Sequence, residues 1–111
     1  PLTSTTSNLI DRQRMAMMRP GAILINTARG GLVEQAALVE SLTSGHLSAA
    51  GLDVFATEPV PSDEALLQLD NVVIAPHLAW LTTGTLGRSL KIAVENCRRL
   101  QAGEPLLHRV V

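Results

Sequence analysis

The sequence predicts an α/β fold with a doubly wound parallel sheet, of which the chain holds about half. Short apolar runs of strand length recur at three places, segments with helical spacing separate them, and glycine or proline ends most segments. Continuous apolar runs are typical of strands in a buried parallel sheet, which we expect to be covered on both faces. Alternating strands and helices indicate βαβ crossovers. Three strands make a thin sheet, so half of such a domain describes 111 residues better than a whole one.

The first half of the chain supplies a helix, a strand and a second helix. Asp11 is a suitable N-cap for a short helix to about Met18, which a Pro-Gly pair ends. The run Ala22–Asn26 is the first strand. Apolar residues at helical spacing predict a helix over residues 34–44, and Gly45 suits the position after its end.

The second half continues the alternation and ends in a long helix. Of the three predicted strands, the second has the weakest sequence signal, because it contains alanines and one glycine. In chain order we expect a strand at about Ser48–Val54, a helical turn at residues 64–69, a strand at Val72–Ala75 closed by Pro76, a helix from Thr82 or Thr83 to about Ala102 ended by Gly103, and an extended tail at residues 106–111.

Composition limits the function classes. Charged residues make up 17% of the chain and hydrophobic residues 46%, so either the core is dense or more protein covers part of the surface. We favour the second explanation, that more protein covers part of the surface, and we expect the isolated chain to self-associate. A net charge of -1, no basic stripe, one Trp and one Phe argue against nucleic-acid binding. No apolar run approaches the ~18 residues of a membrane span. We expect an intracellular, cytoplasmic protein.

Side chains with chemical potential follow each predicted strand. Arg29 follows the first strand, Asp53 ends the second with Glu58 a few residues beyond, and His77 follows the third. Ligands of open parallel sheets bind beyond the carboxyl ends of the strands, so these groups share the expected edge. Gly30 and its neighbouring glycine allow a sharp turn and a close approach to a ligand, and a guanidinium there suits capture of a carboxylate.

Each of these residues also has an ordinary structural explanation. Arg29 could be a surface charge, Asp53 a loop cap, and Glu58 a solvated loop residue. A lone His77 would be a structural histidine, but a carboxylate partner favours the imidazolium form and makes it a candidate general acid. Trp80 could pack in the core or form a pocket wall.

The other reactive side chains give weaker indications of function. His46, beside a helix end, is interpreted as structural, and His108 in the tail has no evident partner. Cys97 excludes an internal disulfide and is expected to be a small apolar packing residue of the last helix. The three histidines and the acids have no metal-site spacing, so no metal is expected.

Two long motifs resemble a known family. "PGAILINTARGGLVEQAALVESLTSGHLSAAGLDVFATEP" followed by "NVVIAPHLAW" is similar to the D-isomer-specific 2-hydroxyacid dehydrogenases, over nearly the whole chain. The resemblance implies a Rossmann-like NAD(P)-binding domain, and a hydride transfer between NAD or NADP and a small 2-oxo/2-hydroxy acid. "PHLAW" is similar to glyoxylate/hydroxypyruvate reductases, which suggests hydroxypyruvate or glyoxylate as substrate.

The resemblance also assigns roles to residues. Arg29 matches the arginine that binds the substrate carboxylate, His77 the acid/base and Glu58 its carboxylate partner. Asp53 matches the aspartate that holds the nicotinamide carboxamide. The implied cofactor-binding set is Thr27, Ala28, Arg29, Asp53, His77 and Ala79, and the implied substrate pocket is Arg29, His77 and Trp80.

The family's G-x-G-x-x-G turn and the residue that selects NAD or NADP do not occur in the sequence, and we expect both upstream of Pro1. Residues 1–102 then form the C-terminal half of the cofactor domain, and residues 103–111 a tail returning toward a substrate domain. The chain is expected to be inactive alone and its full-length parent a homodimer. The alternative is a non-catalytic nucleotide-sensing or protein-interaction module on the same fold.

Overall fold

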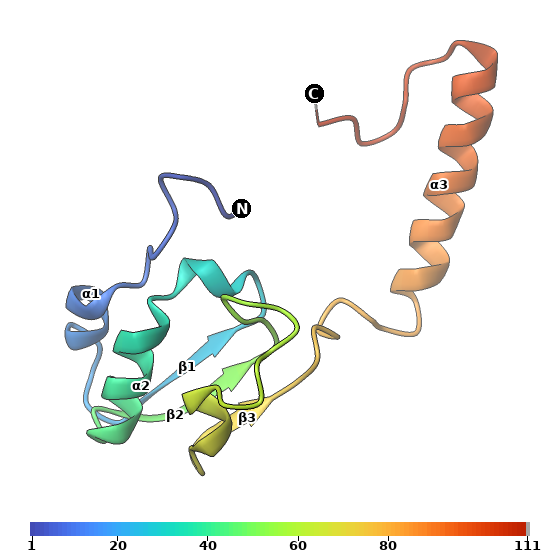
Figure 1. The fold of residues 1–111 in the computed structure, drawn as a ribbon. Helices are drawn as coiled ribbons and strands as arrows, with labels where there is room; N and C mark the ends of the chain where they lie inside the picture. Colours follow the sequence, from blue (N-terminus) through green and yellow to red (C-terminus); the bar gives the residue numbers. More distant parts are fainter. Residues whose placement is uncertain (111) are drawn as a thin grey trace. The chain divides into compact units, whose positions relative to one another are not determined.

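The chain divides into two units, Pro1–Ala79 and Trp80–Val111, and the computed structural model describes residues 1–110 (Figure 1). The first unit holds a three-stranded sheet with its helices, and the second holds one long helix and the tail. In the part of the chain that is described, no helix has the length and hydropathy needed to cross a bilayer.

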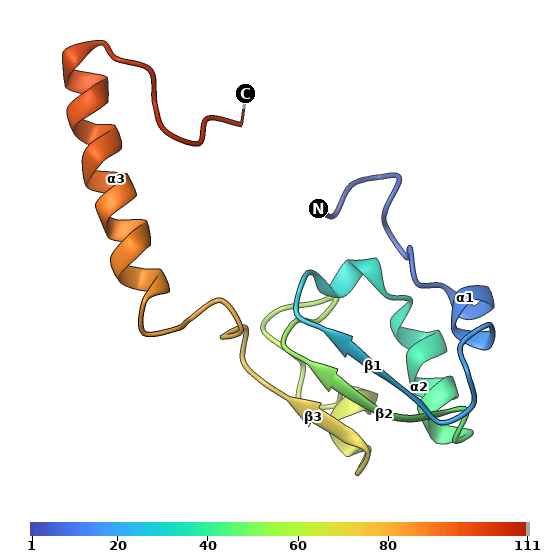
Figure 2. The ribbon, with the colours of Figure 1, turned by 180° about the vertical axis from the view of Figure 1, so that it is seen from behind.

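The sheet of the first unit is parallel, as predicted. Strands β1 (Ala22–Asn26), β2 (Leu47–Leu52) and β3 (Val72–Ile74) lie side by side in the order β1-β2-β3 (Figures 1 and 2). The predicted bounds of β1 are confirmed, whereas β2 ends before Val54 and β3 ends before Ala75. The register pairs the last residue of β1 with that of β2, and that of β2 with that of β3. All three strands therefore end at one edge, where the candidate site residues begin.

Helices α1 (Arg12–Ala16) and α2 (Gln35–Thr43) follow the predicted pattern. Asp11 is the N-cap of α1, since its carboxylate accepts the backbone N–H of Arg14 at 2.8 Å. The helix stops two residues short of the predicted Met18. Gly45 has a φ of 77° just beyond α2, the left-handed conformation for which a glycine at a helix end is suited.

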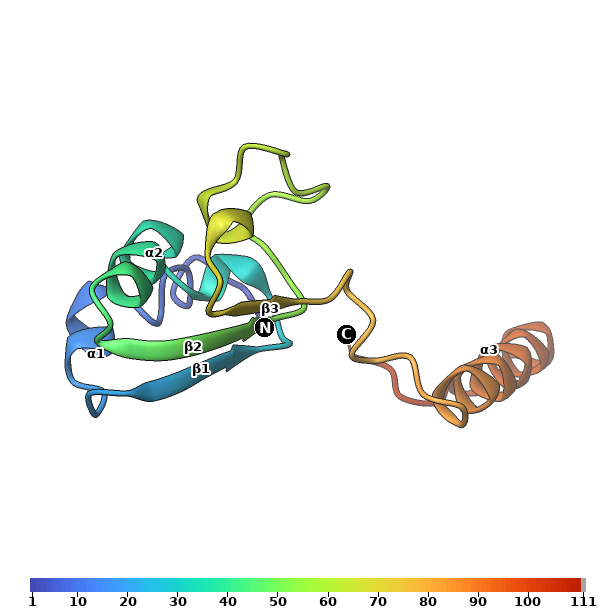
Figure 3. The ribbon, with the colours of Figure 1, turned by 90° about the horizontal axis from the view of Figure 1, so that it is seen from below.

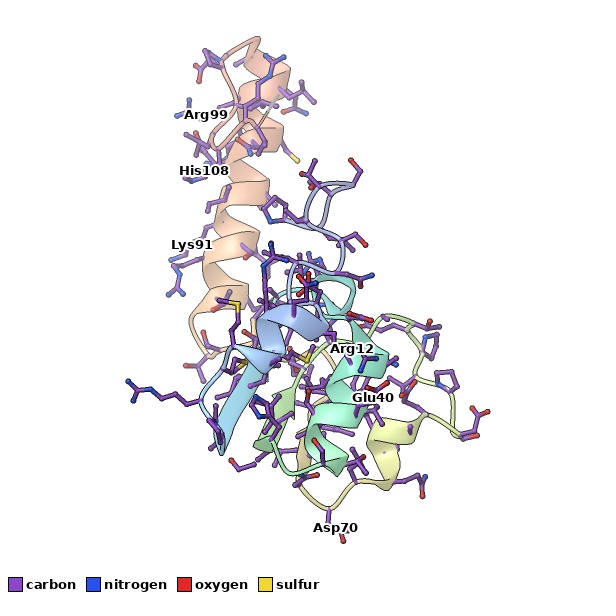
Figure 4. The ribbon with its side chains drawn as sticks, turned by 90° about the vertical axis from the view of Figure 1, so that its left-hand side faces the viewer. Arg12, Glu40, Asp70, Lys91, Arg99 and His108 are labelled. Carbon is purple, nitrogen blue, oxygen red and sulfur yellow. The ribbon has the colours of Figure 1, made fainter. Side chains whose placement is uncertain are left out.

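One face of the sheet carries the core. Figure 3 shows α2 and the short 3₁₀ helix η2 (Ala65–Gln68) on one side of the sheet, with α1 beside α2. The 3₁₀ helix lies within the helical turn predicted at residues 64–69. The largest fully buried side chains of the described residues come from these helices and from β2: Met15, Leu38, Leu47 and Leu66. An ion pair between Arg12 and Glu40, whose side chains point toward one another in Figure 4, joins α1 to α2 at the surface.

Within residues 1–79 the opposite face of the sheet is open, and the expected cover of this face stays a prediction. Ile23, Ile25 and Val73 point to this face and are 61%, 73% and 75% exposed. The helices that connect the strands within residues 1–79 pack on the other side, so alternating residues of β1 are buried and exposed in turn. An apolar strand alone does not reveal which of its faces a neighbouring element covers.

The second unit consists of α3 (Thr85–Ala102) and the tail. Its N-cap is Gly84 rather than a threonine, although the Thr82 hydroxyl accepts the Thr85 N–H at 3.3 Å. Gly103 ends the helix with a φ of 68°, as predicted. The tail is not fully extended: a turn at residues 107–108 is held by Asn96, whose side chain exchanges two hydrogen bonds with the backbone of residue 107.

Cys97 of α3 is exposed, so the prediction that it packs in a core is wrong for this chain. The apolar side chains of α3 are likewise solvent-facing or half-buried, and the structure contains no fully buried residue in this helix. Leu86, Leu90 and Val94 follow one another at helical spacing as an exposed stripe, and such a stripe shows only that a helix can pack against something.

Candidate functional site

The turn after β1 is shaped by Asn26, the buried last residue of the strand. Its side chain is 7% exposed. The amide Nδ2 donates to the carbonyl of Arg29 at 2.9 Å, and the side-chain oxygen accepts the N–H of Ala28 at 3.1 Å. These two bonds fold residues 27–29 into a tight loop at the strand end. The Arg29 side chain is exposed there, and its guanidinium donates to the Ala28 carbonyl at 2.6 Å.

Gly30 follows this loop at the start of a second short 3₁₀ helix, η1 (Gly30–Leu32). A Cβ atom on Gly30 would lie 1.9 Å from the carbonyl carbon of Phe55 and 2.4 Å from the amide nitrogen of Ala56. Its φ is not positive, since the positive-φ glycines are at other positions. The glycine is therefore required by close packing of two backbone segments, and its expected approach to a ligand stays a prediction.

Asp53 links the second strand end to the third. Its side chain is 4% exposed, and its two carboxylate oxygens accept the backbone N–H groups of Leu78 and Ala79 at 2.7 and 2.8 Å. This arrangement holds the loop that begins at His77. A carboxylate has about four lone-pair sites, so these two bonds leave acceptor capacity for a further donor.

Glu58 and His77 form a pair at the same edge. The Nδ1 atom of His77 lies 2.9 Å from Oε2 of Glu58, while Oε1 of Glu58 accepts the N–H of Phe55 at 3.0 Å. His77 has a φ of 56°, a left-handed conformation that histidine adopts more readily than most residues. The Asp53 bonds to the two residues that follow it hold the backbone in that conformation.

The environment keeps Glu58 ionised. The hydrogen bond from His77, followed by the bond from the Phe55 amide, lowers the pKa of Glu58, and the positive charge of Arg29 contributes in the same direction. An ionised carboxylate can only accept hydrogen bonds, so the Nδ1 atom of His77 carries the shared hydrogen.

Two hollows lie at the strand ends of the first unit. One, of about 330 Å³, is bounded by the Glu58–His77 pair and apolar side chains that include Phe55 and Ile74. The other, of about 360 Å³, lies on the open face of the sheet. It is lined by Ile25, Thr27, Gly51, Leu52, Asp53, Val73, Ala75, Leu78 and Ala79.

The structure therefore brings most predicted site residues to one edge. Glu58 and His77 share one hollow, and Asp53 borders both. Thr27 and Ala79 line the second hollow together, whereas Ala28 lines neither and participates through its backbone. Trp80 begins the second unit and is 53% exposed.

Asn26 was missed by sequence reasoning. The available signal was the asparagine that ends the apolar run "AILIN". A polar residue at the end of a buried strand must satisfy its hydrogen bonds there. Outside the site, His46 contacts the carbonyl of Met15 through Nε2 at 3.0 Å, which agrees with a structural role. Among residues 1–110, no group of three His, Cys, Asp or Glu side chains is placed to hold a metal.

Comparison with known proteins gives consistent matches. Residues 1–79 match the profile of the D-isomer specific 2-hydroxyacid dehydrogenase, NAD binding domain. D-3-phosphoglycerate dehydrogenase of Mycobacterium bovis is 47% identical over 94% of this chain, and the match covers 20% of that protein. Glyoxylate/hydroxypyruvate reductase B of Pectobacterium atrosepticum is 46% identical over 94% of this chain and 32% of its own length.

Solved structures agree. A D-isomer specific 2-hydroxyacid dehydrogenase from Xanthobacter autotrophicus Py2, in complex with NADPH and MES, is 44% identical with a TM-score of 0.86. The match covers 100% of this chain and 45% of that one. The chain thus spans less than half the length of each of these three relatives.

Proposed function

The chain belongs to the D-isomer specific 2-hydroxyacid dehydrogenase family, and we propose that it supplies the catalytic groups of an oxidoreductase that interconverts small 2-oxo and 2-hydroxy acids. The observation that carries this proposal is the Glu58–His77 pair, 2.9 Å apart, at the strand edge where Arg29 also stands. The activity belongs to a longer protein, since the relatives extend well beyond the matched segment.

In this proposal His77 is the acid and base. Reduction of a 2-oxo acid needs a hydride on carbon, which bound NAD(P)H supplies, and a proton on oxygen. His77 donates that proton from Nε2 and takes it back in the reverse direction. The ionised Glu58 fixes the ring orientation through Nδ1 and stabilises the positive charge of the protonated ring.

Arg29 is proposed to hold the substrate. Its guanidinium is exposed at the strand edge and can bind a carboxylate with two parallel hydrogen bonds. The same positive charge stabilises negative charge that develops on the carbonyl oxygen during reduction. A 2-oxo acid presents both groups on adjacent carbons, so one arginine can serve both purposes.

The hollow lined by Thr27, Asp53 and Ala79 is proposed to take the nicotinamide end of the cofactor. Its apolar walls suit a flat ring, and the remaining acceptor capacity of Asp53 suits the carboxamide N–H. Ala28 and Arg29 border the same edge through the turn after β1. Either NAD or NADP is proposed as the cofactor. The structure of the Xanthobacter relative contains NADPH.

Hydroxypyruvate or glyoxylate is the proposed substrate. The support is the "PHLAW" segment and the similarity to a glyoxylate/hydroxypyruvate reductase. The similarly close phosphoglycerate dehydrogenase makes 3-phosphoglycerate the first competitor to include in a substrate comparison.

The test follows oxidation of NADH and NADPH by the full-length gene product with hydroxypyruvate, glyoxylate and pyruvate, and reduction of NAD and NADP with 3-phosphoglycerate. His77→Asn should lower kcat by about 10²–10⁴-fold, because asparagine tolerates the left-handed backbone but cannot transfer the proton. The matched control is His108→Asn, a second histidine with a φ of 55°, which should retain activity. Arg29→Ala should raise KM for the oxo acid and lower kcat. Tight NADH binding without turnover of any oxo acid would favour the nucleotide-sensing module instead.

A further inference from the structure

We propose that Asn26 and Asp53 form one buried positioning unit that sets the relative placement of Arg29 and His77. The inference rests on the proposed function, because it concerns how the two reactive side chains are held. Asn26 and Asp53 are the buried polar residues of the core region, at 7% and 4% exposure among the residues described. Both end strands and both direct their side chains at backbone groups of neighbouring loops.

The first half of the unit fixes the arginine. Asn26 bonds to the carbonyl of Arg29 at 2.9 Å and to the amide of Ala28 at 3.1 Å, so both sides of the loop are attached to one rigid strand residue. The amide group suits this task because it offers a donor and an acceptor on a single planar group. Aspartate in its place would accept from Ala28 but repel the Arg29 carbonyl.

The second half fixes the histidine. The Asp53 carboxylate accepts the N–H groups of the two residues directly after His77, at 2.7 and 2.8 Å. A carboxylate alone can accept both bonds, because an amide would turn its NH₂ toward one of the N–H groups. His77 is thereby located from its backbone by Asp53 and from its ring by Glu58.

The two halves are joined by a direct bond. The backbone N–H of Asp53 donates to the backbone carbonyl of Asn26 at 3.0 Å, continuing the β1–β2 ladder past the last paired residues. A continuous path thus runs from the Arg29 carbonyl through Asn26 and Asp53 to the His77 loop. Among the described residues no buried side-chain polar atom lacks a partner, those of Asn26 and Asp53 included, and a satisfied network of this kind has few alternative arrangements.

The consequence is that Asn26 acts on the reaction only through Arg29, whereas Asp53 positions His77 in addition to the cofactor contact proposed for it. They are positioning residues, since misplacement of a reactive group by about 1 Å can cost about 100-fold in rate. Asn26→Ser should therefore lower kcat/KM for the oxo acid by about 10–100-fold while leaving the Kd of NADH within about 2-fold.

A double-mutant cycle in the full-length protein separates this role from general destabilisation. In the Arg29→Ala background, Asn26→Ser should change kcat/KM by less than about 2-fold, because the group it positions has gone. Asn71→Ser is the matched control: Asn71 also bonds two backbone carbonyls, those of Leu42 and Ser48, but at the opposite edge of the sheet. It should lower stability and leave kcat/KM unchanged.

An equal loss of kcat/KM on Asn26→Ser in both backgrounds would overturn the proposal. If Arg29→Ala alone leaves turnover intact, the proposed function fails instead, so the two failures are distinguishable. Amide hydrogen exchange of the unmodified protein supplies a test that needs no variant: the Ala28, Leu78 and Ala79 amides should exchange slowly, as amides with buried partners do. Fast exchange at these three positions would also overturn the proposal.

Discussion

Replacement of Gly30 by alanine should destabilise the first unit strongly. The new Cβ would lie 1.9 Å from the Phe55 carbonyl carbon and 2.0 Å from its oxygen, where ordinary contact begins at 3.4 Å. These are backbone atoms, so no side-chain rotation can relieve the overlap, and one of the two segments must move.

The cost can be worked from these contacts. Overpacking in a core costs about 1–3 kcal/mol. Separating the segments also strains the bond between the Phe55 amide and Glu58, worth about 1 kcal/mol. We therefore expect Gly30→Ala to lower the free energy of unfolding by about 2–4 kcal/mol. With an m-value of about 1 kcal/mol/M, the urea midpoint would fall by about 2–4 M.

The assay is urea unfolding followed by far-UV circular dichroism, with Gly51→Ala as the matched control. A Cβ on Gly51 would meet only the Ile25 side chain, at 3.6 Å, which is ordinary contact. Its free energy of unfolding should stay within about 0.5 kcal/mol of the unmodified chain, or rise slightly through reduced entropy of the unfolded state. Equal midpoints for the two alanine variants would refute the packing explanation of Gly30.

Three further outcomes follow from the structure. Because the pKa of Glu58 is lowered in the folded state, the unfolded chain binds more protons in acid. The contribution of Glu58 to the free energy of unfolding should therefore be present above about pH 4.3 and lost as the pH falls through the folded pKa. Glu58→Gln should make the urea midpoint less dependent on pH over that range. Leu38→Ala, at a side chain 1% exposed, should cost about 2–5 kcal/mol, and Leu100→Ala, at one 71% exposed, less than about 0.5 kcal/mol by the same assay. Leu90→Glu on the exposed stripe of α3 should reduce self-association of the isolated chain in size-exclusion chromatography with light scattering, and an unmodified chain that is monomeric at high concentration would contradict this.

The elements that were predicted well are those whose signals are local. Ala22–Asn26 was identified as a strand with correct bounds because five residues of an apolar run are flanked by turn residues on both sides. Asp11 and Gly103 were identified as helix ends because capping depends on a side chain or a φ value within one turn. The strand Leu47–Leu52 was placed less well, since its alanines and glycine give no clear boundary.

Some features of the candidate site were likewise predictable from local sequence, and others were not. The sequence alone determined the order of elements and the parallel sheet, because periodicity and chain order are local properties of the sequence. It also determined that Arg29, Glu58 and His77 follow strand ends, and parallel strands must end at a common edge. Only the tertiary structure decided which face of the sheet is covered, why residue 30 must be glycine, and that Asn26 and Asp53 support the two loops. The Gly30–Phe55 approach and the Asp53 bonds join residues 25 or 26 positions apart, and spacing along the chain does not reveal such contacts. The Asn26 bonds span only two or three positions, but they depend on the burial of Asn26, which the fold decides.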